Sequence, residues 1–175
     1  TKGNTKAEAV MLLNHQAALD YVLNKPDYFR ELTVQKILEI HRFLTKGLGI
    51  PNKIRAGRVG ITGTNYKPLA KANQIQKALQ DLCDLINSKR NVLEKAFIAL
   101  LLIAYIQPFE DGNKRTARII CNALLLPNKY CPISFRTVEP EDYRYATLLF
   151  YEQNSIPSFK KIFMEQLEFS TANYF

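Results

Sequence analysis

The feature that most constrains the fold is an unbroken apolar run from Ala96 to Ile106. A helix made of this run would be apolar on every side, and such helices lie buried in a protein core or inside a membrane. The run is shorter than the roughly 18 uninterrupted apolar residues that a membrane span needs. We therefore predict a fully buried central helix, and we expect no membrane association.

Amphipathic patterns flank this run, and we predict an all-α helical bundle that forms one domain over residues 1–175. A chain of 175 residues with 47% hydrophobic residues is large enough to bury a core of its own. Besides the central helix, the patterns predict helices at about 6–23, after an N-cap at Thr33, at 72–88, from about 113 to Pro127, from Glu139-Pro140 onward, and at 158–169.

Residues 54–68 form the only stretch with strand character. Val59 and Ile61 alternate with glycines, and the sequence from Gly63 to Asn65 favours a turn before Tyr66. We predict a short β-hairpin here, with an exposed edge that could pair with another strand. Taken alone, this pattern is also typical of an ordinary surface hairpin.

Charge and cysteine usage limit the classes of partner. The formal net charge is +8, but basic residues are scattered among acidic ones, so we do not expect nucleic-acid binding. The three cysteines Cys83, Cys121 and Cys131 lack C-x-x-C spacing and predict buried free thiols in a reducing, cytoplasmic setting. No signal peptide is recognisable at the start, although the sequence begins at Thr1 without Met.

The sequence from Gln107 to Arg118, QPFEDGNKRTAR, follows the central run and carries anion-binding features. Pro108 disfavours helix at Gln107, and Gly112 permits a tight turn, so a new helix should begin near Asn113. The free N–H groups of Gly112, Asn113 and Lys114 would then lie at the positive end of the helix dipole. A phosphate group suits this position.

Neighbouring side chains would support such a site. Arg115 and Arg118 lie three residues apart on one helix face, and each offers a planar set of donors for phosphate oxygens. Asp111 could hold Mg²⁺ against the phosphates, and Phe109 should anchor the loop in the core. The simpler alternative is a solvated helix N-terminus with two surface arginines.

This stretch resembles the active-site loop of the Fic (filamentation induced by cAMP) family, whose pattern is His-Pro-Phe-x-Asp/Glu-Gly-Asn-Gly/Lys-Arg-x-x-Arg. The resemblance implies a protein adenylyltransferase that moves AMP from Mg·ATP to a Ser, Thr or Tyr hydroxyl of a target protein. It places Asp111 on Mg²⁺, the anion hole at Gly112, Asn113 and Lys114, and Arg115 and Arg118 on the outer phosphates. The matching positions are Pro108, Phe109, Asp111, Gly112, Asn113, Lys114, Arg115 and Arg118.

Gln107 departs from the family pattern at the histidine that serves as general base. An imidazole accepts a proton near neutral pH, whereas a carboxamide can orient a hydroxyl but cannot take its proton. Losing a general base typically costs on the order of 10²–10⁴ in rate. We expect nucleotide binding with weak or absent transfer, and the sequence leaves open whether Gln107 is natural or engineered.

Two further segments resemble family elements. The hairpin resembles the Fic flap, which pairs backbone-to-backbone with a segment of the target and would here use Ile61, Thr62, Gly63, Thr64, Asn65 and Tyr66. Residues 1–5 resemble the end of the inhibitory motif Ser/Thr-x-x-x-Glu-Gly-Asn, in which a glutamate pairs with the second loop arginine. Lys2 stands where that glutamate would be, so inhibition through this arm would be lost.

Several alternatives stay open. With Lys114, the sequence Asn113-Lys114-Arg115 resembles the Asn-Lys-Arg of the Doc toxins in the same superfamily. Doc toxins transfer phosphate instead of AMP. A catalytically inactive module that binds nucleotide or a partner is a third hypothesis, supported by Gln107. The sequence also leaves a homodimer open, and we expect His15 and His41 to be packed rather than metal-binding residues.

Overall fold

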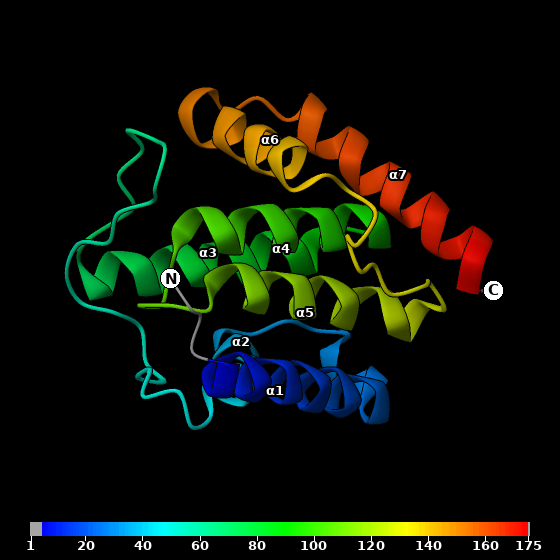
Figure 1. Cartoon of the computed structure of the whole chain (residues 1–175), viewed down its shortest axis with the longest axis horizontal. Helices are drawn as coiled ribbons and strands as arrows, with labels where there is room; N and C mark the ends of the chain where they lie inside the picture. The colour runs from blue at the N-terminus through cyan, green and yellow to red at the C-terminus, as the bar shows by residue number, and fades with distance from the viewer. Residues whose placement is uncertain (1–4, 175) are drawn as a thin grey trace.

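The computed structural model describes residues 5–174, which form seven α-helices and two short 3-10 helices. Helix α4 (Val92–Ile106) runs through the middle of the bundle, and α5 (Asn113–Leu125) returns alongside it (Figure 1). The prediction of a buried central helix is confirmed, because seven α4 residues from Ala96 to Ile106 are buried.

The remaining helices cover this central pair. On one side, α1 (Thr5–Asn24) and α2 (Val34–Thr45) pack against α5, and α3 (Ala72–Ser88) packs against α4. On the other side, α6 (Pro140–Gln153) and α7 (Pro157–Tyr174) lie together above α4 (Figure 1). The short 3-10 helices are η1 (Pro26–Phe29) and η2 (Leu126–Asn128). The all-α prediction is therefore confirmed.

Local sequence signals set several helix starts. The Thr33 hydroxyl accepts a hydrogen bond from the backbone N–H of Lys36 at 3.3 Å, which caps α2 as predicted. The Asn91 side chain accepts one from the N–H of Glu94 at 3.1 Å and caps α4. At its other end, α4 leads into the Gln107 loop, where the Gln107 N–H donates to the Ile103 carbonyl at 3.2 Å.

The predicted β-hairpin at residues 54–68 is corrected by the structure. No strand occurs among residues 5–174, and this flap segment is an irregular loop. Two of its backbone N–H groups bond outside the segment: Gly57 N–H donates to Ala70 C=O at 2.9 Å, and Asn65 N–H donates to a Glu152 side-chain oxygen at 2.6 Å. Alternation of Val59 and Ile61 with glycine was too short a pattern to specify a ladder.

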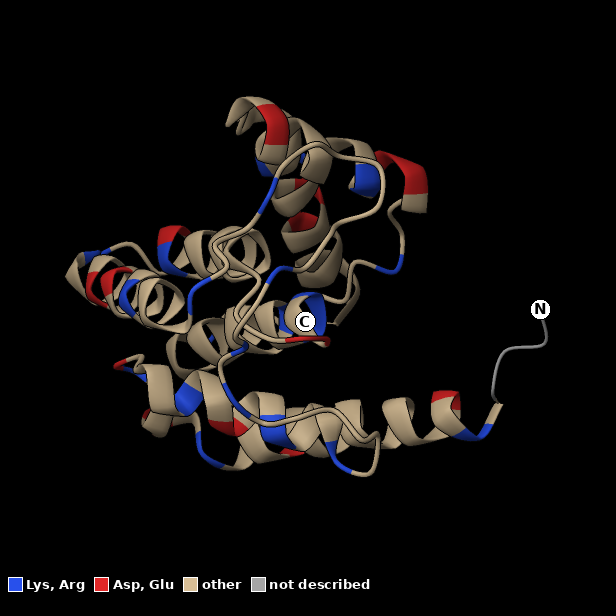
Figure 2. Cartoon of the chain, turned by 90° about the vertical axis from the view of Figure 1, so that its left-hand side faces the viewer, with Lys and Arg blue, Asp and Glu red and all other residues tan. Residues whose placement is uncertain are grey.

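The expectation of buried free thiols is confirmed. All three cysteines are buried and free, and burial raises the pKa of the Cys83 thiol to about 12. None of the described helices has the length and apolar character needed to cross a membrane. Figure 2 shows basic and acidic residues interspersed over the helices. The Gly3-Asn4 part of the predicted inhibitory arm lies outside the described residues.

Candidate active site

The loop between α4 and α5 begins and ends with left-handed backbone. Gln107 has φ 52° and Gly112 has φ 85°. This conformation costs a residue with a side chain about 1 kcal/mol or more, and only Gly112 avoids that cost. A Cβ on Gly112 would lie 3.4 Å from Cδ2 of His41, which is ordinary contact, so the position favours glycine because of its backbone conformation. The two turns bring the end of α4 close to the start of α5.

Asn113 holds the loop closed. Its side-chain oxygen accepts a hydrogen bond from Phe109 N–H at 2.9 Å, and its side-chain nitrogen donates to Phe109 C=O at 2.9 Å. The same nitrogen lies 3.1 Å from the side-chain oxygen of Gln107. Because Asn113 is only 5% exposed, these bonds are shielded from water. The residue predicted to form part of the anion hole therefore also shapes the loop.

Each end of the Gln107 carboxamide is hydrogen-bonded within the protein. Its nitrogen donates to the Ala104 carbonyl at 2.5 Å, and its oxygen accepts from Asn113. Its backbone carbonyl accepts from Nε of Arg55 at 2.6 Å. A carboxamide held in this way has no basic atom to offer to a hydroxyl. The geometry thus fits the predicted loss of the general base at this position.

Arg55 was not singled out from the sequence, yet it lies directly behind the loop. Besides Gln107, it donates from Nη1 to the Gly57 carbonyl at 2.6 Å, and its backbone N–H donates to the Pro108 carbonyl at 3.0 Å. It is 1% exposed, and burial lowers the pKa of its guanidinium. Among the described residues no carboxylate pairs with it. Arg55 therefore joins the start of the flap segment to the loop.

His41 supports the loop from α2. Its ring stacks on Phe109 with a centroid distance of 3.7 Å, and its Nε2 lies 2.9 Å from the Asp111 carbonyl. Both His41 and Phe109 are fully buried, so the predictions of a packed histidine and of a core anchor at Phe109 are confirmed. The half-buried His15 of α1 lies near Arg115 and Arg118, and burial together with these cations lowers its pKa.

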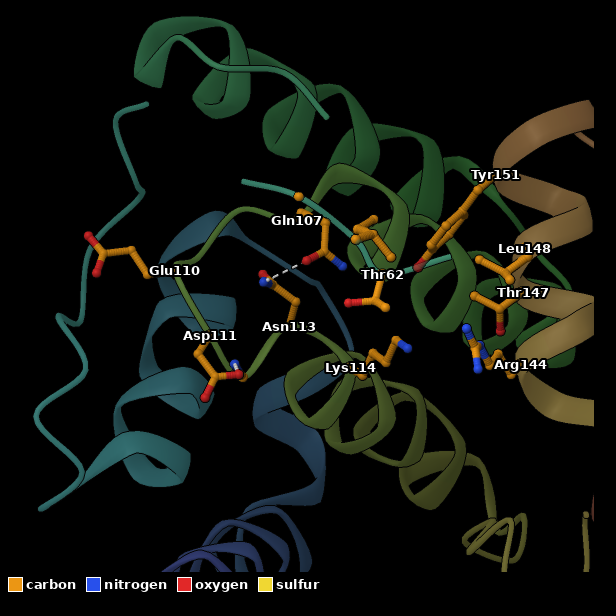
Figure 3. A pocket seen from close by; sticks show the side chains of 13 residues that line it. Thr62, Gln107, Glu110, Asp111, Asn113, Lys114, Arg144, Thr147, Leu148 and Tyr151 are labelled. Atoms are coloured by element: carbon orange, nitrogen blue, oxygen red, sulfur yellow. Dashed lines mark hydrogen bonds between the residues drawn. The ribbon is translucent and has the colours of Figure 1, made fainter. Parts of the chain in front are cut away.

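A cavity of about 510 Å³ opens beside the α5 N-terminus (Figure 3). Its walls come from the loop and first turn of α5, from the flap segment and from α6. These walls consist of Gln107 and residues 110–114, of residues 60–62, and of Arg144, Thr147, Leu148 and Tyr151. The predicted anion-hole residues and Gln107 therefore face one cavity, together with two of the six predicted flap residues.

The α5 N-terminus presents its positive end to this cavity. The Gly112 N–H is already bonded to the Asp111 carboxylate at 2.6 Å, which leaves the N–H groups of the first helical turn at the cavity. Lys114 extends into the same space, where burial, followed by the charges of Arg118 and Arg144, lowers its pKa. Both features favour an anionic ligand.

The two predicted phosphate-binding arginines do not line the cavity. Nη2 of Arg115 pairs with the Asp111 carboxylate at 3.2 Å, and its Nη1 lies 3.4 Å from the Leu44 carbonyl. The Arg118 guanidinium lies over the Tyr143 ring, 4.9 Å from its centroid, and its buried Nε has no hydrogen-bond partner. Their predicted contact with the outer phosphates would require these side chains to turn toward the ligand.

The predicted target-binding residues take different positions. Ile61 and Thr62 line the cavity, whereas Thr64 and Asn65 are both hydrogen-bonded to Glu152 of α6. Tyr66 turns inward, because its hydroxyl donates to the Tyr105 carbonyl at 2.9 Å and its ring stacks on Tyr105. Tyr66 therefore anchors the flap segment in the core.

Helix α6 supplies a cavity wall that the sequence reading largely missed. Arg144, Thr147, Leu148 and Tyr151 are spaced as i, i+3, i+4 and i+7, which places them on one face. The same spacing was available in the sequence, but it is equally typical of plain core packing.

Asp111 is the only predicted metal ligand. The exposure of its carboxylate and the groups around it indicate whether it could bind Mg²⁺. Its carboxylate is 67% exposed, and Mg²⁺ is usually bound by one or two carboxylates together with substrate phosphates and water. No group of three or more potential metal ligands occurs among residues 5–174. Asp111 could therefore hold Mg²⁺ only with a ligand that supplies further oxygens, and it would have to share its carboxylate with Arg115.

Comparison with known proteins identifies the family that shares this loop and flap segment. The Fic/DOC family model matches residues 31–125, which include the flap segment, the loop and α5. The chain belongs to the Fic/DOC family. It is 26% identical over 151 residues to the protein adenylyltransferase fic-1 of Caenorhabditis elegans and 32% identical over 119 residues to protein adenylyltransferase Fic of Nematostella vectensis. These alignments cover 82% and 64% of this chain but only 29% and 27% of the relatives, so the chain spans less than a third of their length.

Solved Fic structures share the fold. The C. elegans Fic-1 structure superposes with a TM-score of 0.77 at 22% identity, covering 99% of this chain and 53% of that one. A Bartonella tribocorum BepC structure with bound AMPPNP has a TM-score of 0.65 at 17% identity, covering 87% of this chain and 85% of that one. The IbpAFic2 structure in complex with adenylylated Cdc42 has a TM-score of 0.69 at 19% identity, covering 95% of this chain and 57% of that one.

Proposed function

We propose that this Fic domain binds Mg·ATP in the cavity at the α5 N-terminus and transfers AMP to a Ser, Thr or Tyr hydroxyl of a target protein. The observation that carries the proposal is one cavity shared by the loop of residues 107–114 and the flap segment. The relatives named as protein adenylyltransferases, and the family structure that contains AMPPNP, support the choice of nucleotide.

The proposed reaction is a displacement at the α-phosphorus of ATP. The target oxygen forms a bond to that phosphorus, the bond to the bridging oxygen breaks, and pyrophosphate leaves. The N–H groups at the start of α5 and the Lys114 ammonium would stabilise the phosphate charge. Bound Mg²⁺ would supply further neutralisation of the phosphates, with Asp111 as its ligand. Arg115 and Arg118 would add charge if they turn toward the phosphates.

The proton of the attacking hydroxyl has no acceptor at residue 107. The Gln107 carboxamide is not basic, so it cannot take the proton. We therefore propose that transfer is impaired by on the order of 10²–10⁴ relative to a chain with histidine at this position. Nucleotide binding would persist.

The target would dock on the flap segment. That a family member can hold a protein target is supported by its structure in complex with adenylylated Cdc42. The backbone around Ile61 and Thr62 lies at the cavity edge, so a target segment beside it would bring a hydroxyl next to Gln107. The Asn65 N–H is occupied by Glu152 in the structure. A target that paired along the whole flap would have to replace this bond.

A second candidate is transfer of phosphate instead of AMP. Lys114 reaches into the cavity, and a cation there could place a different phosphate beside the acceptor. The mass added to a modified target distinguishes the two reactions. A third candidate, an inactive binding module, is favoured because the carboxamide of Gln107 has no basic atom.

Calorimetry with Mg·ATP and a labelled-ATP transfer assay together test the proposal. We expect the chain to bind Mg·ATP, and we expect Gln107→His to gain transfer of the adenylyl label to target proteins. Gln107→Ala, which frees the loop without adding a base, serves as the control and should gain nothing. Absence of Mg·ATP binding would refute the nucleotide site. If Gln107→His binds ATP but modifies nothing in a lysate, the inactive-module alternative is correct.

A further inference from the structure

Arg144 projects from α6 into the cavity beneath the flap segment. A Cβ built on Gly63 would lie 2.6 Å from its Nη2, so the guanidinium passes directly under a flap residue that has no side chain. Figure 3 shows Arg144 and Lys114 pointing toward each other across the cavity, one from α6 and the other from α5. Arg144 is not part of the loop motif of residues 107–118. It brings a positive charge to the cavity from α6, opposite the start of α5.

Two cations that face each other repel, and a negative charge between them would relieve that repulsion, although both residues are exposed and water already screens it. Arg144 is close enough to Lys114 that its charge helps to lower the Lys114 pKa, after the effects of burial and of Arg118. Among the ion pairs of residues 5–174, none involves Lys114 or Arg144. Of the two carboxylates at the cavity, Asp111 pairs with Arg115, and Glu110 points away from the cations in Figure 3. The protein itself therefore leaves this positive charge uncompensated.

We propose that Arg144 and Lys114 together bind a phosphate group of the nucleotide, so that the cavity holds the phosphates from both α5 and α6. This inference rests on the proposed function, because it assumes that the ligand is a nucleotide. A guanidinium offers only donors, in a planar fork that matches two phosphate oxygens, and its affinity for them is charge-assisted. An anion between Arg144 and Lys114 would also remove their mutual repulsion.

With this contact, Arg144 would strengthen the binding of phosphorylated nucleotides but not the binding of adenosine. The contact would be present with ATP and ADP and absent with adenosine, since adenosine carries no charge. If Arg144 instead lay against the base, it would strengthen the binding of adenosine and ATP by the same factor. The two assignments therefore differ in a measurable way.

Calorimetric titration of the wild-type chain, Arg144→Gln and Arg144→Lys with Mg·ATP, Mg·ADP, AMP and adenosine tests the inference. Arg144→Gln should weaken Mg·ATP binding by about tenfold or more and change adenosine binding by less than about twofold. Arg144→Lys, which keeps the charge without the fork, should lose less. Arg90→Gln is the matched control, because Arg90 is exposed and outside the cavity and its loss changes the net charge equally. Circular dichroism verifies that each variant is folded.

The outcomes separate this inference from the proposed function. If the wild-type chain binds Mg·ATP and Arg144→Gln binds it equally well, only the role of Arg144 is refuted. An equal loss for adenosine and ATP would also refute the phosphate contact and would assign Arg144 to the base. If the wild-type chain binds none of the four compounds, the proposed nucleotide site and the role of Arg144 both fail.

Discussion

The side-chain nitrogen of Asn113 lies 3.1 Å from the side-chain oxygen of Gln107, so the first residue of α5 holds the residue that ends α4. Asn113 makes this contact while it also binds both backbone groups of Phe109. One buried side chain therefore fixes the shape of the loop and the orientation of the residue at the general-base position. Loop stability and site geometry are linked through it.

Asn113→Ala should destabilise the protein by about 2–3 kcal/mol. The substitution leaves the N–H and C=O of the fully buried Phe109 without partners, and each unsatisfied buried group costs about 1–3 kcal/mol. Urea unfolding monitored by circular dichroism measures the free energy of unfolding. Asn173→Ala is the control, because that side chain makes one exposed bond to the Phe169 carbonyl and should change stability by about 0.5 kcal/mol or less. Equal effects of the two substitutions would contradict a structural role for Asn113.

Arg55→Ala should cost about 3 kcal/mol. It deprives the Gln107 and Gly57 carbonyls of their donors and removes a side chain that is 1% exposed. Arg55→Met fills most of the space and removes a buried charge that no carboxylate compensates, so it should cost less, although the loop loses the same hydrogen bonds. The free energies of unfolding of both variants provide the comparison.

Arg30→Ala is the matched control for Arg55. Arg30 is exposed and pairs only with Asp27 at 2.7 Å, so its loss should change stability by less than about 1 kcal/mol. If Arg55→Met retains Mg·ATP binding as well as the wild-type chain does, then the hydrogen bonds from Arg55 to the loop do not position the site.

Much of the fold follows from local sequence signals. The apolar run of α4 has no exposed side, so only a central position buries it, and the side chains of Thr33 and Asn91 satisfy the free N–H groups at two helix starts. The flap segment was mispredicted because its backbone partners lie elsewhere in the chain: Ala70, Pro108 and Glu152. Contacts of that kind carry no local signature.

In the candidate site, too, some residues have a local sequence signal and others do not. The loop from Gln107 to Lys114 was recognisable, because Pro108 and Gly112 require its turns and Asn113 begins a helix. Arg55 and Arg144 could not be found in this way. One is an arginine near the start of the flap segment, and the other lies on a helix face whose spacing is also typical of a core. Only the tertiary structure places Arg55 behind the loop and Arg144 at the cavity.

His41→Ala should destabilise the chain by about 3 kcal/mol, whereas His41→Phe should cost about 1–2 kcal/mol. Both variants lose the contacts of the imidazole with the Asp111 carbonyl at 2.9 Å and with the Asn52 side-chain oxygen at 3.0 Å, but phenylalanine keeps the ring that stacks on Phe109. Thermal and urea unfolding compare the two. If both variants lose the same amount, the stacked ring contributes nothing, and the polar contacts alone account for the effect.

The contact between Glu152 and the flap segment should weaken in acid. The Thr64 hydroxyl, followed by the Asn65 N–H, donates to the Glu152 carboxylate and lowers its pKa below the ordinary value of 4.5. A carboxyl group whose pKa is lower in the folded state stabilises that state above its unfolded pKa. This stabilisation is lost as the pH falls through the folded pKa. The chemical shift of the Asn65 amide, followed by NMR, should therefore titrate with a midpoint below 4.5.

Two variants assign this titration to Glu152. Glu152→Gln should abolish the acid titration of the Asn65 amide, because a carboxamide carries no charge to lose. Glu165→Gln, on the exposed side of α7 and paired only with Lys161 at 3.8 Å, should leave it unchanged. A midpoint at or above 4.5 in the wild-type chain would mean that the flap segment is not held by the charged carboxylate. Because the same Asn65 N–H is one that a target strand would use, Glu152→Gln should also expose it to faster hydrogen exchange at neutral pH.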